Sequence, residues 1–550
     1  MPESPPARTA SAPSEHKGLI PAPKVFIPAA VLLLVFVTLA AVMPARMGEL
    51  ITAANTSVVT DLGWWYVLIV TGFVIFAAWI ALSPMGNIRL GKDREEPEFG
   101  LKSWFAMLFA AGMGIGLVFW GVAEPLNHFA APPPGTEGDG AALARNAMDV
   151  TYLHWGLHAW AIYVVVGLAL AYAVHRKGRP VSIRWALEPL LGKRVTGFWG
   201  DLIDVIAVVG TLFGVATSLG FGVSQIGAGL AYLGVVDEAT NTVLVTLIVV
   251  ITLIALVSVV TGIDKGIKWL SNINMGLAGV LMLLVLLLGP TVFLLSDFVQ
   301  QVGSYLQNFL RLSFNTLSFR GEAGQEWMAG WTTYYWGWWM SWAPFVGVFI
   351  ARISRGRTVR QFVAGVLLVP TLLTFFWFAV MGGSGLYREL FGQGGLVDEE
   401  GAVSTNNALF QLLDGLPGAT LLAVIAIFLI VVFFVTSSDS GSYVVDMIAS
   451  GGNPNPPVWS RAFWASLEGV VAAVLLVAGG LAALQTMAIL VALPFSIVMV
   501  LMVVATTKAL MAEQRQIDRK HELAFAERIA DHVNGDGDFD STTAGVGSTR

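Results

Sequence analysis

The residues best suited to specific chemistry are tryptophans, which gather between Trp331 and Trp342. This stretch of twelve residues holds five of the chain's 19 tryptophans and two of its tyrosines. Within it, the i, i+4 spacing brings Trp338 and Trp342 to one face of a helix, with Trp339 beside them. Grouped indole faces attract a cation that cannot donate hydrogen bonds, such as a quaternary ammonium group. Lipid-facing or core tryptophans would give the same pattern, so this stretch alone does not distinguish a cation cage from either of these alternatives.

A second aromatic group lies in HWGLHAWAIY, which contains Trp155, Trp160 and Tyr163. Two helices that carry these groups could present aromatic faces to one cavity, and this convergence favours a cation cage. His154 and His158 are spaced i, i+4, as in some metal sites, but the sequence shows no nearby carboxylate or third ligand. Packed or hydrogen-bonded histidines are therefore the favoured interpretation.

Glycine and polar residues interrupt other apolar segments. Gly112, Gly114 and Gly116 alternate within FAAGMGIGLVFWG and weaken a helix, which a bilayer tolerates only beside protein or a water-filled cavity. The segment GTLFGVATSLGFGVSQIGAG fits either close helix packing or unwinding. In FFVTSSDSGS, Asp439 is an acid within a membrane helix and hence a functional candidate, with a polar helix–helix contact as the alternative.

The composition places these segments in a membrane. The 550 residues are 56% apolar and 12% charged, and their mean hydropathy is +0.72. Long apolar runs predict helices rather than a β-barrel, and the bilayer is the expected surrounding. The absence of cysteine excludes disulfides and thiolate metal sites. Without a phosphate-binding GxxxxGK[ST] sequence or a nucleophile motif, we expect no ATP-driven transport, no enzyme, no cofactor and no nucleic-acid partner.

The apolar runs predict an all-α integral membrane protein with twelve spanning helices. The segments lie at about 25–45, 64–83, 104–130, 148–174, 203–234, 242–261, 273–296, 331–352, 361–383, 418–449, 460–482 and 484–507. An even number of spans puts both tails on one side. If that side is cytoplasmic, the positive-inside rule is satisfied, because the outer side holds only five of the 31 basic residues: Arg46, Arg145, Arg311, Arg320 and Arg388.

Motifs along the chain resemble one family of membrane transporters. WGWWMSWAPFVGVFIARISRGRT resembles the eighth-helix signature of the betaine/choline/carnitine transporter (BCCT) family. AAGMGIGLVFWGVAEP, HWGLHAWAIY, ATSLGFGVSQIGAG and FFVTSSDS resemble that family's third, fourth, fifth and tenth helices. The resemblance, over roughly residues 25–510, implies a LeuT-like fold of two five-helix inverted repeats after two extra helices. It also implies a trimeric symporter for trimethylammonium or related zwitterionic solutes.

This resemblance divides the chain into six parts. These are a disordered cytoplasmic tail (1–24), two leading helices (25–100), a first five-helix repeat (101–296), a periplasmic amphipathic surface helix (297–330), a second five-helix repeat (331–507) and a charged cytoplasmic tail (508–550). Deleting 511–550 is expected to leave basal transport intact. The implied location is the bacterial inner membrane, with both termini in the cytoplasm.

The resemblance implies a substrate site made of two groups. The family's aromatic box and the aromatics beside it match Trp155, Trp160, Tyr163, Trp338, Trp339 and Trp342. The unwound part of the family's third helix matches Gly112, Met113, Gly114 and Gly116. Free amides there could face a substrate carboxylate, because a helix N-terminus favours negative charge. Trp331, Tyr334 and Tyr335 are left to the membrane interface.

The resemblance also implies a sodium site made of oxygen ligands, which suit a hard cation. Carbonyls of the third helix and hydroxyls of the tenth form it, and the matching residues are Ala110, Met113, Phe433, Thr436 and Ser437. A second sodium site of the family is matched by Thr211 and Phe345, but Val215 stands where the family has another threonine. We therefore predict at least one sodium as the coupling ion and leave the second open.

The expected function is sodium-driven import of a quaternary-ammonium solute by alternating access. Glycine betaine is the first candidate, followed by choline or a related solute. A proton-coupled choline transporter is the alternative within the family, because hydroxyl ligands alone do not prove sodium. A solute channel or osmosensor, in which the aromatics gate rather than bind, is the alternative from another class. Uptake against a gradient separates a carrier from a channel.

Overall fold

The computed structural model describes residues 20–533 except Met113 and residues 262–263. This part of the chain is helical, and its β-type pairings are two isolated bridges, Arg89–Thr358 and Val397–Val403. The helices are α1 (Pro23–Val42), α2 (Pro44–Leu82), α3 (Leu101–Gly112), α4 (Ile115–Ala130), α5 (Gly140–Trp155), α6 (Leu157–Ala171), α7 (Ile183–Ala186), α8 (Glu188–Leu191), α9 (Phe198–Tyr232), α10 (Asn241–Thr261), α11 (Asp264–Leu288), α12 (Thr291–Ser313), α13 (Gly321–Gly330), α14 (Thr332–Ile353), α15 (Val359–Phe391), α16 (Ala408–Asp414), α17 (Ala419–Ala449) and α18 (Val458–Val533). Short 3₁₀ or π turns join some of them: η1 (Pro84–Asn87), η2 (Tyr172–Arg176), η3 (Gly192–Thr196) and η4 (Ser318–Arg320).

Eight helices of the described chain are long and apolar enough to cross a membrane, or nine if the bent pair α11–α12 is one span. The twelve predicted segments all fall on helices, but several of these helices are not simple spans. The segment 104–130 is divided into the short helices α3 and α4, and 148–174 is divided between α5 and α6. The last two segments both lie in α18. An all-α protein with many membrane spans agrees with this structure.

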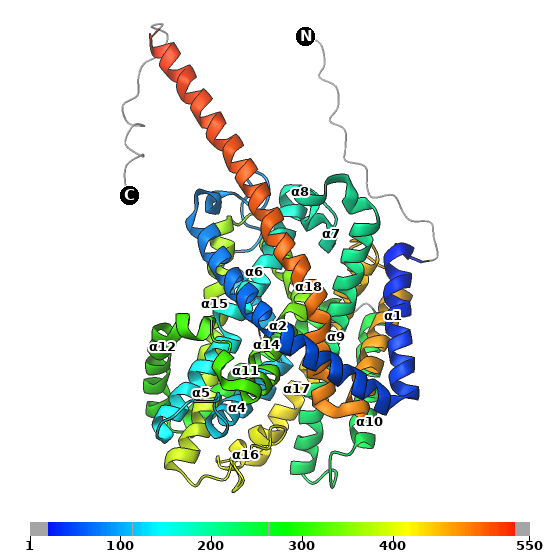
Figure 1. Cartoon of the computed structure of the whole chain (residues 1–550), viewed down its shortest axis with the longest axis vertical. Coiled ribbons are helices and arrows are strands. Elements are labelled where there is room, and N and C mark those ends of the chain that lie inside the picture. The colour runs from blue at the N-terminus through cyan, green and yellow to red at the C-terminus, as the bar shows by residue number, and fades with distance from the viewer. Residues whose placement is uncertain (1–19, 113, 262–263, 534–550) are drawn as a thin grey trace.

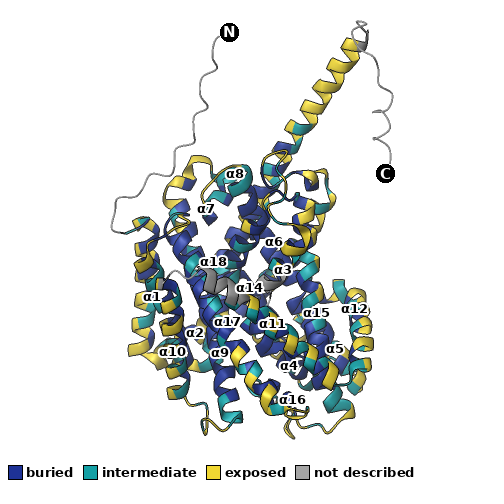
Figure 2. Cartoon of the chain, turned by 180° about the vertical axis from the view of Figure 1, so that it is seen from behind, coloured by how far each residue is buried: buried dark blue, intermediate teal, exposed yellow. Residues whose placement is uncertain are grey.

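The central helices differ from the peripheral ones in what surrounds them. Helices α6, α9 and α14 lie inside the bundle, whereas α1, α10 and α12 lie at its edge (Figure 1). Every residue of α6 after Leu157 is buried, as expected for an apolar helix in a protein core. Figure 2 shows exposed residues along the outer helices, and α10 exposes Leu253 and Val257. Such apolar outer faces fit contact with lipid.

The glycine-rich segment of α9 is a continuous helix, so close packing rather than unwinding explains its composition. A Cβ atom on Gly214 would lie 3.1 Å from the backbone of Ser341 in α14. A Cβ atom on Gly220 would lie 2.2 Å from the Leu484 side chain in α18. Small residues let helices approach closely in a membrane. Helix α9 thereby packs against both α14 and α18.

Glycines also mark two sharp changes of direction. Gly480 has φ +64° and ψ −150° inside α18, a conformation that glycine adopts without steric penalty. This kink lies within the predicted segment 460–482, next to the start of 484–507. At Gly289–Pro290 the chain bends by 111° between α11 and α12. The predicted surface helix therefore begins at Thr291 rather than 297, because this glycine–proline pair ends α11. Its periplasmic position stays a prediction.

Helices α7 and α8, which lie in the basic stretch 176–197, are at the end of the bundle from which α18 projects (Figure 1). There Arg176 donates hydrogen bonds to Glu513 of α18 and to Asp93, both at 2.5 Å. The hydrogen bond and the charge of Arg176 hold the pKa of Asp93 below its usual value. Glu513 also accepts from Tyr172 at 2.6 Å and from Lys177 at 3.0 Å. The charged tail is thus attached to the bundle through Glu513. The expectation that deleting 511–550 is harmless did not take this contact into account.

Two truncations should therefore differ in stability. Cutting the chain after Ile517 keeps Glu513 and removes a stretch that is exposed throughout 518–531, so we expect no change. Deleting 511–550 leaves Arg176, Lys177 and Tyr172 without their shared carboxylate, which costs about 1–3 kcal/mol. Thermal unfolding of the purified proteins, with Glu513→Gln in the full chain as the point variant, measures the difference. Equal melting temperatures for both truncations would contradict this role of Glu513.

Candidate substrate site

One cavity of about 450 Å³ is enclosed mainly by α4, α6, α14 and α17. Eight of the predicted substrate residues line it: Trp155, Trp160, Tyr163, Trp338, Trp339, Trp342, Gly114 and Gly116. Of the other two, Gly112 ends α3 and Met113 lies outside the described residues. A larger cavity of about 630 Å³ lies beside Arg311 and Arg320 and contains none of the predicted site residues. Because it lacks paired indoles, we place the candidate site in the first cavity.

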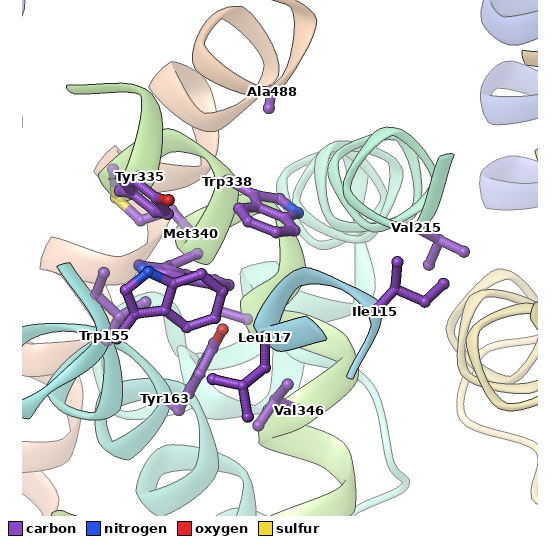
Figure 3. Packing of buried hydrophobic residues seen from close by; sticks show 14 of the residues in the cluster. Ile115, Leu117, Trp155, Tyr163, Val215, Tyr335, Trp338, Met340, Val346 and Ala488 are labelled. Atoms are coloured by element: carbon purple, nitrogen blue, oxygen red, sulfur yellow. The ribbon is translucent and has the colours of Figure 1, made fainter. Parts of the chain in front are cut away.

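The aromatic side chains in the first cavity form a three-sided cage. Trp338 and Trp339 stack with ring centroids 4.5 Å apart and planes at 17°. Trp155 stands nearly perpendicular to Trp339, at 4.8 Å and 71°. Tyr163 approaches Trp339 from another side, with centroids 6.4 Å apart, and Trp160 packs at 5.3 Å from Tyr163. Figure 3 shows Trp155, Tyr163 and Trp338 directed from different helices toward the start of α4.

A break at Gly156 positions both tryptophans of the fourth predicted segment. It ends α5 at Trp155 and starts α6 at Leu157, where the sequence pattern suggested one uninterrupted helix. A Cβ atom at Gly156 would lie 2.4 Å from the carbonyl oxygen of Tyr152, so only glycine fits. The end of α5 leaves carbonyl groups without a helical partner. The carbonyl of His154 instead accepts a hydrogen bond from the cage, because Trp339 Nε1 donates to it at 2.8 Å.

The start of α4 brings glycine backbone to the aromatic cage. Gly114 is extended, with φ −159°, and α4 begins at Ile115, so the expected break in the third segment is present. The first amides of a helix have no partner within it. A Cβ atom on Gly116 would lie 2.3 Å from Trp338 and 3.2 Å from Trp155. Only a glycine at this position lets the backbone of α4 come so close to both indoles.

Three of the five residues matched to the sodium site lie at another wall of the same cavity. Phe433, Thr436 and Ser437 of α17 line it. Thr436 Oγ1 donates to the Val432 carbonyl at 2.9 Å, and the Asn274 amide of α11 lies 3.4 Å from the same hydroxyl. Asn274 is not among the predicted site residues, although an asparagine in an apolar helix was a usable signal. Ala110 lies in the last turn of α3, and the structure does not describe its side chain.

The two residues matched to the possible second sodium site lie on α9 and α14, which pack against each other. Phe345 lines the cavity, but Thr211 does not. The Thr211 hydroxyl is fully buried and donates to the Ala207 carbonyl of its own helix at 2.7 Å. Val215 packs against Gly441 of α17, where a hydroxyl ligand would have been needed. The second sodium site accordingly gains no support from the geometry.

A buried carboxylate behind the cage was missed by the sequence analysis. Glu124 of α4 is fully buried and contacts polar groups of three helices. Trp155 Nε1 donates to its Oε2 at 2.5 Å, and the Tyr335 hydroxyl donates to the same oxygen. Its Oε1 lies 2.7 Å from His154 Nδ1 and 3.3 Å from His128 Nε2. An acid within a membrane segment was the available signal, which the analysis applied to Asp439 alone.

Two expectations about neighbouring residues are therefore wrong. Tyr334 and Tyr335 were assigned to the membrane interface, yet both are fully buried, and Tyr335 packs 5.8 Å from Trp339. The statement that no carboxylate lies near His154 is also wrong, because Glu124 comes from another helix. His158 does not join this cluster and stacks on Trp336 at 5.5 Å. Helical spacing within one segment could not reveal the partner from α4.

The chain is similar to known transporters along most of its length. The family model "BCCT, betaine/carnitine/choline family transporter" matches residues 24–515. A transporter of Mycobacterium tuberculosis (strain ATCC 25618 / H37Rv), named only as uncharacterized, is 51% identical over 534 residues, which are 96% of this chain and 89% of that protein. A glycine betaine transporter of Bacillus subtilis (strain 168) is 45% identical over 496 residues, 89% of this chain and 96% of that protein.

A third relative is named for more solutes than glycine betaine alone. A glycine betaine/proline/choline transporter of Vibrio parahaemolyticus (serotype O3:K6) is 42% identical over 478 residues, 83% of this chain and 84% of that protein. These matches confirm the resemblance that the aromatic and glycine motifs indicated. The chain belongs to the betaine/carnitine/choline transporter family and is a multi-pass membrane transporter, not an enzyme.

Proposed function

We propose that this chain is a secondary active symporter that imports a quaternary-ammonium compatible solute, with glycine betaine as the main substrate. Choline or a related solute is a weaker substrate in this account, and an inward sodium gradient drives transport. One observation carries the proposal: stacked Trp338 and Trp339, with Trp155 packed edge-to-face against Trp339, line a cavity whose other walls offer glycine backbone and hydroxyl groups. The names of the Bacillus and Vibrio relatives support this substrate class.

Each end of glycine betaine has a matching wall in this cavity. The trimethylammonium group binds against the indole faces, where a desolvated cation–π contact contributes about 2 kcal/mol. The carboxylate points toward the first amides of α4 at Gly114 and Gly116, which favour negative charge. Sodium binds near Thr436 and Ser437, whose hydroxyls are of the ligand type that a hard cation takes. Substrate and ion therefore occupy neighbouring parts of one site.

This proximity gives a physical route to coupling. Sodium stabilises the junction of α3, α4 and α17, which also presents the glycine amides to the substrate. Each ligand then raises the affinity for the other by the same factor. Rocking of one helix set against the other exposes the loaded site to the inside, as in transporters built from inverted repeats.

The proposed membrane arrangement follows the same family pattern. Twelve spans comprise two leading helices and two inverted five-helix repeats, with α3–α4 as the broken helix of the first. Both termini lie in the cytoplasm of a bacterial cell, next to the loops rich in lysine and arginine. Three copies assemble in the inner membrane, each with its own substrate site.

One observation favours a proton as the coupling ion instead. Glu468 of α18 is fully buried, and neither carboxylate oxygen has a hydrogen-bond partner among the described residues. Its Oε1 lies 3.6 Å from the Cβ position of Gly441, the same glycine that contacts Val215. A carboxyl group without donors is stable in an apolar interior only when it is neutral. Glu468 could therefore carry a proton through the transport cycle.

Uptake of radiolabelled glycine betaine into proteoliposomes tests the proposal. Sodium coupling predicts accumulation above the external concentration, abolished when potassium replaces sodium, and unchanged sodium-driven uptake by the Glu468→Gln variant. Accumulation driven by a pH gradient alone, and lost in Glu468→Gln, would instead establish proton coupling. Equilibration without accumulation would overturn the symporter and favour the channel.

A further inference from the structure

Glu124 lies directly behind the aromatic cage and outside the cavity itself. Its carboxylate contacts Trp155, which forms one wall of the cage, and Tyr335, which packs on Trp338 and Trp339. We propose that Glu124 is the counter-charge for the cationic head of the substrate and acts through the rings of Trp155 and Tyr335. The proposal rests on the proposed function and deepens it: the ligand must carry a permanent positive charge at the cage.

The hydrogen-bond donors around Glu124 match an ionised carboxylate. An indole N–H can only donate, so Oε2 must accept from Trp155, and it accepts from the Tyr335 hydroxyl as well. The ring nitrogens of His154 and His128 lie within hydrogen-bond reach of Oε1. In the tautomers that carry hydrogen on His154 Nδ1 and His128 Nε2, four donors face the four lone-pair directions of one carboxylate. In these tautomers a protonated carboxyl group would leave one of the donors without an acceptor.

The two histidines fit the neutral form, so they do not supply the missing positive charge. His154 Nε2 lies 3.0 Å from the Thr332 hydroxyl, which can donate to it while Nδ1–H donates to Glu124. His128 Nδ1 is buried without a hydrogen-bond partner among the described residues. A charged imidazolium would need an acceptor there, because both of its nitrogens carry hydrogen.

No lysine or arginine within the described part of the chain pairs with the carboxylate either. Among the described ion pairs, the only partners of Glu124 are His128 and His154. A buried charge without a counter-charge is strongly unfavourable. The Trp155 indole that donates to Glu124 also lines the candidate cavity, which can admit a cation. A quaternary ammonium group bound there supplies the opposite charge, and the intervening ring contributes its own negative face.

The hydrogen bonds from Glu124 also act on the rings. They fix the Trp155 indole nearly perpendicular to Trp338 and Trp339, at 87° and 71°. Charge-assisted hydrogen bonds are stronger than neutral ones, and neighbouring bonds polarise one another. A negative charge at the N–H edge of Trp155 makes the face of this cavity-lining ring more attractive to a cation. The same contacts explain why an acid is present in an otherwise apolar part of α4.

A metal centre is the other chemistry that these side chains could support. The ligand atoms of Glu124, His128 and His154 lie within 4.8 Å of one another. In this structure, however, Trp155 and Tyr335 occupy Oε2, and Thr332 engages the outer nitrogen of His154. The 2.7 Å separation of Glu124 Oε1 and His154 Nδ1 is that of a hydrogen bond, which a metal at these atoms would have to replace, so the arrangement favours the counter-charge.

Binding to the purified full-length protein tests the proposal with a matched pair of ligands. 3,3-Dimethylbutanoate has the shape of glycine betaine but carries carbon in place of the cationic nitrogen. We expect Glu124→Gln to weaken glycine betaine binding about tenfold, which corresponds to roughly 1.4 kcal/mol, while binding of 3,3-dimethylbutanoate changes less than twofold. Glu124→Asp keeps the charge and should keep most of the discrimination between the two ligands. Glu326→Gln, the same change on the exposed face of α13, is the control.

The outcomes separate this proposal from the proposed function. Unchanged discrimination in Glu124→Gln would overturn the counter-charge role, and so would an equal loss of both ligands, which a purely structural residue would give. If the wild-type protein already binds both ligands equally, the cation cage itself is wrong. If only Glu124→Gln loses the preference for the cationic ligand, both conclusions hold.

Discussion

Replacing Trp339 with leucine is expected to weaken glycine betaine binding about 30-fold, because a desolvated cation–π contact contributes roughly 2 kcal/mol. Trp339 contacts every other wall of the cage: it stacks on Trp338, stands perpendicular to Trp155 and lies 6.4 Å from Tyr163. Its Nε1 also donates to the freed carbonyl of His154. Leucine supplies neither the ring face nor the donor.

The matched control for Trp339→Leu is Trp79→Leu. Trp79 lies in α2 and is 45% exposed on the outside of the bundle, so the same substitution there removes a lipid-facing indole. Affinity is measured by equilibrium binding to protein whose melting temperature is recorded in parallel. An unchanged affinity of well-folded Trp339→Leu protein would remove this residue from the site.

Replacing Gly116 with alanine is expected to reduce glycine betaine affinity about 5- to 150-fold, because overpacking of about 1–3 kcal/mol falls on the cage itself. The added Cβ would lie 2.3 Å from the Trp338 ring. That ring cannot yield easily, since it stacks on Trp339 at 4.5 Å and on Tyr334 at 5.7 Å. Any movement that admits the methyl group separates the paired indoles.

Gly279→Ala in α11 provides the control for Gly116→Ala. No atom lies within 4 Å of the Cβ position at Gly279, and alanine favours a helix over glycine by about 1 kcal/mol. Gly279→Ala should therefore bind as the wild type does. Wild-type affinity in Gly116→Ala would show that the cage does not need the close approach of α4.

The sequence predicted those parts of the site whose residue types have few possible roles in a membrane helix. Tryptophans at helical spacing, such as Trp338 and Trp342, have few physical explanations, and the second aromatic group around Trp155 reduced the number of explanations further. Alternating glycines before Gly116 predicted a break, because repeated glycine in a membrane segment otherwise weakens the helix without benefit. Long apolar runs predicted the helices themselves.

The missed features all depend on contacts between segments far apart in the chain. Glu124 acquires its role from Trp155 and Tyr335, which lie 31 and 211 residues further along the chain. Tyr335 has the composition of an interfacial residue, and only its burial against α4 shows otherwise. Thr211 matches a family ligand by position, yet its hydroxyl bonds within its own helix. Periodicity describes one helix at a time and cannot supply these pairings.

The predicted helix boundaries were wrong at Gly156 for a similar reason. The break at Gly156 looks like a single tolerated glycine within a spanning segment, and its necessity appears only when the Tyr152 carbonyl and Phe375 are in place. The attachment of Glu513 to Arg176 likewise joins residues 337 positions apart. From composition alone, deletion of the charged tail was therefore expected to be harmless, whereas the structure shows the tail bonded to the bundle through Glu513.

The central claim is that the cage recognises a permanent positive charge through aromatic faces. Isothermal titration calorimetry tests this claim most directly. The purified wild-type protein is titrated with glycine betaine and, separately, with 3,3-dimethylbutanoate. We predict that glycine betaine binds at least about tenfold more tightly, since the two ligands share shape and carboxylate and differ in the cation. Equal affinities for the two ligands would contradict the account.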